Sequence, residues 1–438
     1  MTARTAVPAP NTLRQNLLAL YALQAANYGI PLLVLPFLVR AVGIEHFGLI
    51  AFAQAIVQYF VFAVDAGFNN NATREIAVHR GRGADPVLEI YWATQAVRAA
   101  IMLLATAVFM LLLLLVPALR AHWQLYLLSY ATVPGTFLFS AWLYQGLERM
   151  RLMATLQVAG RVAAAAALVL LIRRPEDYLL AAGVQASATL VSGVIGLVLC
   201  LRSGLLRWRR PGAAAIRRTL SQGGRLFWSE LMGTCISGSG VSVLGLVAPS
   251  AAVGAYAAIE KLVRALMTAY LPISQALLPR VAAHLAAAPS SVRLWRRLGA
   301  MTGCLLVAAI LGATLVSVWA GDLLALAFGP SLAGHGALLA LMIWVLPVDV
   351  LNVTVGQLFV FAAGHRDAYA RALATGALVQ GALSLALAVP LGSYGVAAAF
   401  LAAQLWMLAM LLHALLRIRR RAGWPSPLDD GAREGAPA

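Results

Sequence analysis

The chain has 438 residues, of which 61% are hydrophobic and only 11% are charged. Soluble domains average about 45–50% apolar and about 25% charged residues, so this composition excludes an ordinary soluble domain and predicts a protein that lies in a lipid bilayer. The net charge of +17 comes from short basic clusters between long apolar runs. That distribution is typical of membrane-protein loops and gives no reason to expect nucleic-acid binding.

Twelve apolar windows follow one another along the chain, most of them close to the length that spans a bilayer. They lie near 17–40, 45–67, 87–116, 122–144, 152–172, 178–201, 222–247, 251–275, 297–320, 336–362, 368–390 and 394–416. The first window is too long for the core of a signal peptide, so we expect it to remain as a span. The connections are short, and we predict an all-α integral membrane protein without a separate catalytic domain.

A weak internal repeat divides these helices into two halves. At an offset of 206 residues, Gly48 matches Gly254 and Arg74 matches Arg280. We expect an N-terminal tail (1–16), a six-helix lobe (17–201), a basic linker (202–221), a second six-helix lobe (222–416) and a C-terminal tail (417–438). Two pseudo-symmetric bundles with the same orientation indicate a transporter with a central cavity.

The basic residues also predict the orientation of the chain. If both termini are cytoplasmic, most of the 33 lysines and arginines lie on the cytoplasmic side. Since cytoplasmic loops of membrane proteins carry an excess of positive charge, we expect both tails and the linker in the cytoplasm.

Four basic residues lie inside the windows: Arg98, Arg161, Lys261 and Arg264. Counted from the helix starts, they are roughly 14–18 Å deep in a hydrocarbon core about 30 Å thick. A cation at that depth costs at least about 2.5–3.5 kcal/mol, so we expect these side chains to line a cavity and bind substrate. Two alternatives remain open. Arg264 could be neutralised by Glu260 four residues earlier, and Arg98 or Arg161 could form an interhelical pair, for example with Asp349.

Cations at mid-membrane favour an anionic substrate such as a diphosphate, which arginine binds through paired hydrogen bonds. Glu230 and Asp349 are acids inside the windows, and we consider them candidates for proton or sodium coupling. The alternative for each is a salt bridge to one of the arginines.

Patterns of catalytic or metal-binding residues are absent from the sequence. It contains no GxSxG, HExxH or P-loop motif, and its seven histidines show no ligand spacing. The cysteines are isolated within apolar runs, which indicates neither a disulfide nor a metal site. We therefore predict a transporter and not an enzyme, with no cofactor other than a possible coupling ion.

The second window ends in the polar motif "DAGFNNNATRE", which begins at Asp65. We expect Gly67 to allow a sharp turn where the helix leaves the membrane on the cytoplasmic side. Our hypothesis is a cytoplasmic gate in which Asp65 and Glu75 pair with Arg74 or with Arg280 of the other lobe. An ordinary helix end is the alternative.

The segment from Pro31 to Gly81, with "LPFLVRAVG", "FGLIAFAQA" and "DAGFNNNATRE", resembles the opening helices of Wzx-type O-antigen flippases. "YQGLERM" and "GSYGVAAAF", which begin at Tyr144 and Gly392, are similar to later segments of that family. The resemblance implies membership of the multidrug/oligosaccharidyl-lipid/polysaccharide exporter superfamily, in the bacterial inner membrane. It also implies an oligosaccharide on undecaprenyl pyrophosphate as substrate, moved from the cytoplasmic to the periplasmic leaflet for O-antigen or exopolysaccharide assembly. A polysaccharide polymerase and a chain-length regulator are the implied partners.

Three other functions remain as alternatives. A multidrug or lipid II exporter would share the superfamily, although a cationic cavity would repel cationic drugs. A membrane polysaccharide polymerase or ligase would need a large external loop, which the short connections do not provide. A scaffold without transport activity would not account for charges inside the membrane.

Overall fold

The computed structural model describes residues 13–65, 67–204, 206–224, 239–268, 274, 277–278, 281–285 and 292–422. Within these ranges the chain forms helices and short connections, and no strand occurs there. The chain divides into two compact units, Met1–Ser242 and Val243–Ala438. The predicted all-α class is confirmed.

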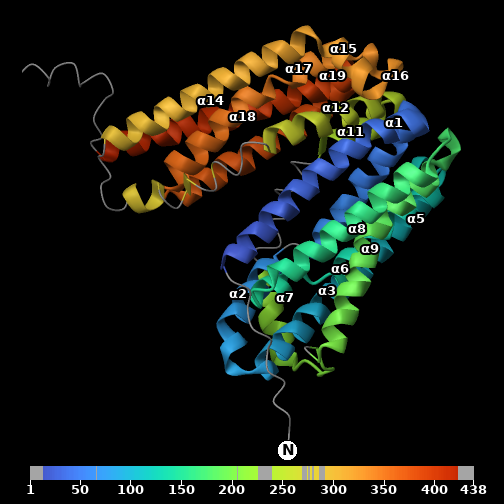
Figure 1. The fold of residues 1–438 in the computed structure, drawn as a ribbon, viewed down its shortest axis with the longest axis vertical. Helices are drawn as coiled ribbons and strands as arrows, with labels where there is room; N and C mark the ends of the chain where they lie inside the picture. The colour runs from blue at the N-terminus through green and yellow to red at the C-terminus, as the bar shows by residue number, and fades with distance from the viewer. Residues whose placement is uncertain are drawn as a thin grey trace, which may run out of the picture. The chain divides into compact units, whose positions relative to one another are not determined.

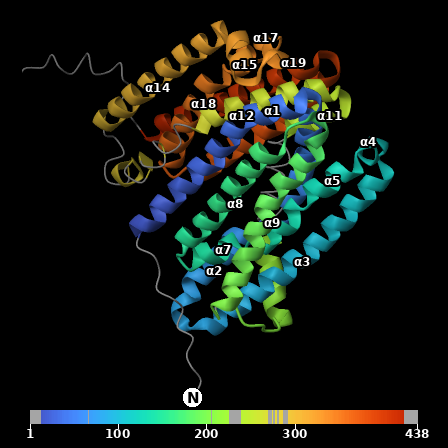
Figure 2. The same ribbon diagram turned by 45° about the vertical axis from the view of Figure 1, so that its right-hand side comes forward.

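The first unit contains the helices of the N-terminal half. They are α1 (Leu13–Asp65), α2 (Phe68–His79), η1 (Arg80–Arg82), α3 (Ala84–Leu115), α4 (Pro117–Arg120), α5 (Trp123–Tyr130), α6 (Thr132–Leu138), α7 (Ala141–Gly146), α8 (Met150–Leu171), η2 (Pro175–Asp177), α9 (Tyr178–Arg202) and a helix over 213–224. Helix α8 packs between α1 and α9, and α9 packs on α5 and α6 (Figure 1). Helix α3 contacts α1, α2 and α6, and Figure 2 shows it running along one side of this unit.

Close approaches of the backbone hold these helices together. A Cβ atom at Gly193 of α9 would lie 2.5 Å from the carbonyl oxygen of Gly135 in α6. Lipid tails are as apolar as leucine side chains, so the hydrophobic effect contributes little to the association of helices in a bilayer. Small residues at helix crossings let the backbones approach closely and gain van der Waals contacts. The two glycines therefore fix the distance between α6 and α9.

The second unit contains the helices of the C-terminal half. They are α11 (Ser239–Val247), α12 (Ser250–Thr268), α14 (Val292–Val318), α15 (Ala320–Phe328), α16 (Pro330–Ala333), α17 (Gly336–Met342), α18 (Val345–Val353), the π-helical η3 (Thr354–Phe361) and α19 (Arg366–Ala422). Helix α18 packs on α12, α14 and α19, and η3 packs on α19. The first residues of α11 belong to the first unit.

Two glycines interrupt the longest helices where the sequence predicts a boundary between spans. Gly43 in α1 has φ 80° and Gly392 in α19 has φ 55°, conformations that glycine adopts without steric cost. The breaks separate the windows 17–40 and 45–67, and 368–390 and 394–416. In the described residues, seven helical stretches are long and apolar enough to cross a membrane, and two of them run through these breaks. The predicted count of twelve spans stays a prediction.

The single helix predicted over 122–144 was wrong, because the structure divides it into α5, α6 and α7. Pro134 lies in the first turn of α6 and has no N–H to donate to the carbonyl of Tyr130, so the helix is interrupted there. A second break follows at Phe139 and Ser140, whose ψ values of 87° and 71° are not helical.

The segment expected as a linker, 202–221, includes most of a further helix of the first unit. The helix over 213–224 belongs to the first unit, where a Cβ atom at Gly223 would lie 2.4 Å from the ring of Phe68. The end of this helix is thus packed against α2, and the division of the chain falls after Ser242.

Candidate functional site

The motif "DAGFNNNATRE" forms a break and a new helix. Gly67 has φ 75°, and α2 then continues from Phe68 to His79. The helix therefore breaks at the motif, as expected from Gly67, and a new helix begins at Phe68. Whether the chain leaves the membrane at this point stays a prediction. The Thr73 hydroxyl donates to the backbone oxygen of Asn69 (2.8 Å), and the backbone oxygen of Trp142 lies 3.3 Å from the same Oγ1. Asn71 Nδ2 donates to Gln222 Oε1 (2.9 Å). Contacts within the first unit satisfy these polar groups and allow the helix to resume.

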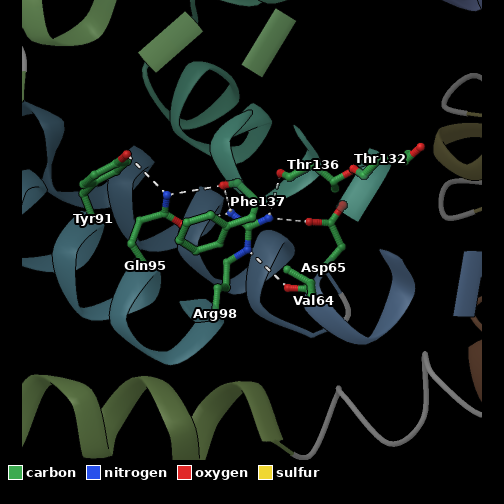
Figure 3. Close-up of polar contacts among 8 residues, drawn as sticks. All are labelled: Val64, Asp65, Tyr91, Gln95, Arg98, Thr132, Thr136 and Phe137. Atoms are coloured by element: carbon green, nitrogen blue, oxygen red, sulfur yellow. Dashed lines mark hydrogen bonds and ion pairs between the residues drawn. The ribbon is translucent and has the colours of Figure 1, made fainter. Parts of the chain in front are cut away.

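Asp65, the last residue of α1, forms an ion pair with Arg98 near the middle of α3 (Figure 3). Arg98 Nη2 lies 2.6 Å from Asp65 Oδ1 and Nη1 donates to Gln95 Oε1 at 3.0 Å. The Arg98 side chain has 0% exposure, whereas that of Asp65 has 32%. The buried arginine thus holds a carboxylate that remains accessible.

The remaining donors of Arg98 bind backbone carbonyls at two helix ends. Nε donates to Val64 (3.2 Å) in the last turn of α1, Nη2 to Thr136 (3.1 Å) and Nη1 to Phe137 (3.3 Å) at the end of α6 (Figure 3). Carbonyls in the last turn of a helix have no partner within that helix, and in a membrane they must be satisfied by the protein. Arg98 therefore satisfies carbonyls at two interrupted helix ends.

A guanidinium group has five N–H donors, and Arg98 makes five hydrogen bonds. No donor is left for a ligand in this arrangement. The interhelical pair that remained open for Arg98 is present, with Asp65 as the acid in place of Asp349. Asp65 faces α3 in this arrangement (Figure 3), and its pairing with Arg74 or Arg280 in a gate stays a hypothesis.

A pocket of about 350 Å³ lies within the first unit, beside Asp65. Its polar lining residues come from α1, α6, α8 and α9: Gln58, Asp65, Thr132, Thr136, Gln157, Arg161, Thr189 and Ser192. Val61, Phe62 and Phe139 contribute apolar surface. Hydroxyl and carboxamide groups can both donate and accept hydrogen bonds, and an arginine binds anions, so the pocket could bind sugar hydroxyls or phosphate oxygens.

Arg161 of α8 is the predicted cation that the structure places at this pocket. Its Nη1 also donates a hydrogen bond to Asn27 Oδ1 of α1. This contact connects the first half of α1 to α8 and orients the guanidinium, which still has other N–H groups for a ligand.

In the second unit, α12 carries Glu260, Lys261 and Arg264. Arg264 Nε and Nη2 lie 2.9 and 2.7 Å from Glu260 Oε1, so the neutralising pair that remained open is present. The Arg264 guanidinium also lies 5.0 Å from the centre of the Phe400 ring. Lys261 is exposed in the structure, and Asp349 of α18 is buried with 9% exposure. Substrate binding by Lys261 and Arg264, and coupling at Asp349, stay predictions.

The other predicted gate residues are only partly described. Arg74 is exposed and Glu75 is half-buried on α2, where the Glu75 backbone oxygen lies 2.9 Å from His79 Nδ1. Arg280 and the coupling candidate Glu230 lie outside the described residues. The gate involving Arg74, Glu75 and Arg280 stays a hypothesis.

An ion pair that the sequence analysis missed joins the segment after "DAGFNNNATRE" to "YQGLERM". Arg80, after α2, lies 2.7 Å from Glu148 in the turn between α7 and α8. A Cβ atom at Gly146 would lie 2.7 Å from the Ile76 side chain and 3.0 Å from the Thr73 backbone oxygen, so α2 and α7 are in close contact. "DAGFNNNATRE" and "YQGLERM" are thus neighbours in the fold, although their sequences are about 70 residues apart.

Comparison with known sequences identifies the family of the chain. Residues 13–284 match the family model described as "Polysaccharide biosynthesis protein". A protein of Escherichia coli (strain K12) named "Putative O-antigen transporter" is 30% identical over 274 residues, which is 63% of this chain and 66% of that protein. A protein of the same name from Shigella dysenteriae is 27% identical over 271 residues, 61% of this chain and 67% of that protein. The matches thus span about two thirds of each relative.

Comparison with solved structures shows the fold. An inward-facing multidrug resistance transporter of the MATE family and MOP superfamily has a TM-score of 0.65 at 14% identity, covering 92% of this chain and 98% of that chain. The lipid II flippase MurJ in an inward closed conformation has a TM-score of 0.69 at 11% identity, covering 90% and 87%. These neighbours agree with the predicted all-α integral membrane fold.

The family model covers more than half of the chain, and the two curated relatives match 63% and 61% of it. The resemblance stated from the sequence is therefore confirmed: the chain belongs to the polysaccharide biosynthesis protein family.

Proposed function

We propose that the protein is a flippase that moves lipid-linked oligosaccharide units across the membrane. The observation that carries this proposal is the polar pocket of about 350 Å³ inside the first unit, which contains the accessible carboxylate of Asp65 and the guanidinium of Arg161. Polar side chains inside a membrane protein are costly, so their collection around one hollow points to a polar ligand. The relatives' name as O-antigen transporters supports a saccharide as that ligand.

We further propose undecaprenyl pyrophosphate as the lipid carrier and movement from the cytoplasmic to the periplasmic leaflet. Arg161 would bind the diphosphate or a neighbouring sugar, and the threonines and glutamines of the pocket would bind sugar hydroxyls. A pocket of this size holds only part of an oligosaccharide. Lys261 and Arg264 of the second unit are proposed as further contacts, and Asp349 and Glu230 as groups that couple transport to protons or sodium.

A multidrug or lipid II exporter remains the alternative within the same fold. The solved neighbours include transporters of both kinds, and at 14% and 11% identity their likeness is one of fold alone. The family match and the relatives named for O-antigen favour the oligosaccharide flippase.

Replacing Arg161 with alanine should lower transport by roughly tenfold or more, because the pocket loses its cation and a charge-assisted hydrogen-bond donor. The measurement is surface polysaccharide in a strain without its own flippase, at matched protein levels in the membrane. Arg161→Lys should retain part of the activity. Arg151→Ala is the control, since Arg151 lies exposed on the same helix and does not line the pocket. Normal polysaccharide with Arg161→Ala would remove Arg161 from the site.

The orientation with both termini in the cytoplasm predicts the location of two connections. A reporter fused after Arg202 should be active in the cytoplasm, and one fused after Ala320 should be active in the periplasm, because the basic segments favour the cytoplasmic side. Paired alkaline phosphatase and fluorescent protein fusions measure this directly. The opposite pattern at both positions would contradict the proposed orientation and direction of transport.

A further inference from the structure

A second hollow, of about 270 Å³, lies in the second unit between the two arms of α19. The arms are the helical parts before and after Gly392, and they pack together where Met407 lies close to Gly376. His365, Ala368 and Arg371 line one side of the hollow, at the start of the first arm. The other side is lined by residues of the second arm: Met410, His413, Ala414, Arg417 and Ile418.

The polar lining residues of this hollow are all basic. They are His365, Arg371, His413 and Arg417, and in the described part of the chain none of these four side chains forms an ion pair. Asp367, the acid closest to them along the first arm, does not line the hollow. Histidine can donate a hydrogen bond in either protonation state, and arginine is always charged. Such a set of donors without a carboxylate suits an oxyanion.

The remaining lining residues form an apolar floor. Ile418 has 6% exposure and belongs to a buried cluster with Ala372 and Leu411, on which Ala368, Met410 and Ala414 pack. Leu373, Leu412 and Leu416, on the same two arms, are 43%, 42% and 52% exposed. The basic residues therefore lie next to exposed apolar surface that could contact the acyl chains of a lipid. A free inorganic anion has no group that would contact this surface.

The hollow also lies where lipid headgroups are found. His365 immediately precedes the first arm, and Arg417 is near the end of the second arm at Ala422, so both belong to the ends of membrane-length helices. The sequence continues with arginines at 419, 420 and 421. Basic residues next to the end of a membrane helix attract anionic lipids, and basic pockets between membrane helices bind their headgroups.

We propose that this hollow binds the phosphodiester headgroup of an anionic membrane phospholipid. Arg371 and Arg417, one from each arm, would bind the phosphate oxygens, and His365 and His413 would donate further hydrogen bonds. The acyl chains would follow the exposed leucines of α19. The bound lipid would hold the two arms together, and its leaflet would be the cytoplasmic one in the proposed orientation.

The test uses the full-length protein in a neutral detergent, with phosphatidylglycerol, phosphatidylcholine or inorganic phosphate added. Binding to the native state raises the melting temperature, so phosphatidylglycerol should raise it while phosphatidylcholine and inorganic phosphate at equal concentration should not. Native mass spectrometry should detect retained phosphatidylglycerol. The variant R371Q/R417Q should bind it more weakly by roughly tenfold or more, since each arginine near an anionic headgroup contributes on that order.

R366Q is the matched control, because Arg366 is exposed at the start of the same helix, lies 5.4 Å from the centre of the Phe361 ring and does not line the hollow. It should keep normal lipid binding. R371K/R417K tests the charge without the guanidinium shape and should bind between wild type and R371Q/R417Q. An equal effect of phosphatidylcholine, or unchanged binding by a folded R371Q/R417Q protein, would overturn the proposal. An equal effect of inorganic phosphate would show an anion site and overturn its assignment to lipid.

Discussion

Replacing Arg98 with alanine is expected to lower the free energy of unfolding by about 3–5 kcal/mol and to abolish transport. The change removes five hydrogen bonds and leaves the carboxylate of Asp65 without its counter-ion. It also leaves carbonyls at the ends of α1 and α6 without a donor, in a protein where the membrane supplies none. Thermal unfolding of the purified protein in detergent measures the effect, alongside the amount of protein in the membrane.

Arg120→Ala is the control for this prediction, because Arg120 is an exposed arginine of the same unit. Asp65→Asn should also destabilise, since it leaves a charged guanidinium with 0% exposure. The loss in the free energy of unfolding of the double variant Asp65→Asn/Arg98→Gln should be smaller than the sum of the losses of its two single variants. The difference should be roughly 0.5–3 kcal/mol, as expected for residues in direct contact. Equal melting temperatures of Arg98→Ala and Arg120→Ala would mean that the ion pair of Arg98 with Asp65 does not hold α1, α3 and α6 together.

Replacing Gly193 with alanine is expected to destabilise the protein by about 1–3 kcal/mol, because the added methyl group has no room. Its Cβ atom would lie 2.5 Å from the Gly135 carbonyl oxygen and 3.1 Å from the Leu138 Cβ atom. The obstacle is mostly backbone, so α6 and α9 would have to move apart. That movement would also displace Thr136, and with it part of the pocket lining.

Gly183→Ala is the matched control on α9. A Cβ atom there would lie 3.6 Å from Leu128 Cδ2, an ordinary van der Waals contact, so this variant should be neutral or slightly stabilising. Melting temperatures of the two variants measure the difference. Equal melting temperatures would mean that the crossing of α6 and α9 adapts without cost.

The sequence was sufficient to predict the fold class and the breaks of the longest helices. Apolar runs of spanning length identify membrane helices because the bilayer selects for length and composition. Gly43 and Gly392 lie between such runs, and the structure breaks there. The division of α5, α6 and α7 was not predicted, because a membrane helix can tolerate a proline when neighbouring side chains satisfy the freed carbonyls. Here Arg98 of another helix satisfies carbonyls at the end of α6.

The partner of Arg98 could not be predicted from the sequence for a similar reason. The sequence analysis considered Arg74 and Arg280 as partners of Asp65 because of the gate hypothesis, and Asp349 as an example of a partner for Arg98. The structure pairs Asp65 with Arg98 instead. Which faces of α1 and α3 meet depends on packing between helices, and residue spacing within one helix carries no such information.

The neutral members of the pocket were also missed. Gln157 is the single carboxamide of its window, and Gln58 shares its window with Gln54, so neither stands out in an apolar helix. A signal was present, since several helices of the first half carry an isolated polar residue inside the span. Because polar groups in a membrane must find partners, such residues on different helices are expected to face one another.

The central claim is that this chain moves lipid-linked oligosaccharides across a bilayer. The most direct measurement reconstitutes the protein with undecaprenyl-pyrophosphate-linked oligosaccharide in vesicles and follows how fast the sugar becomes accessible to a lectin on the other side. The account predicts rapid translocation with the wild-type protein, little with Arg161→Ala, and wild-type rates with Arg151→Ala. Translocation by the folded wild-type protein no faster than in protein-free vesicles, under both proton and sodium gradients, would contradict it.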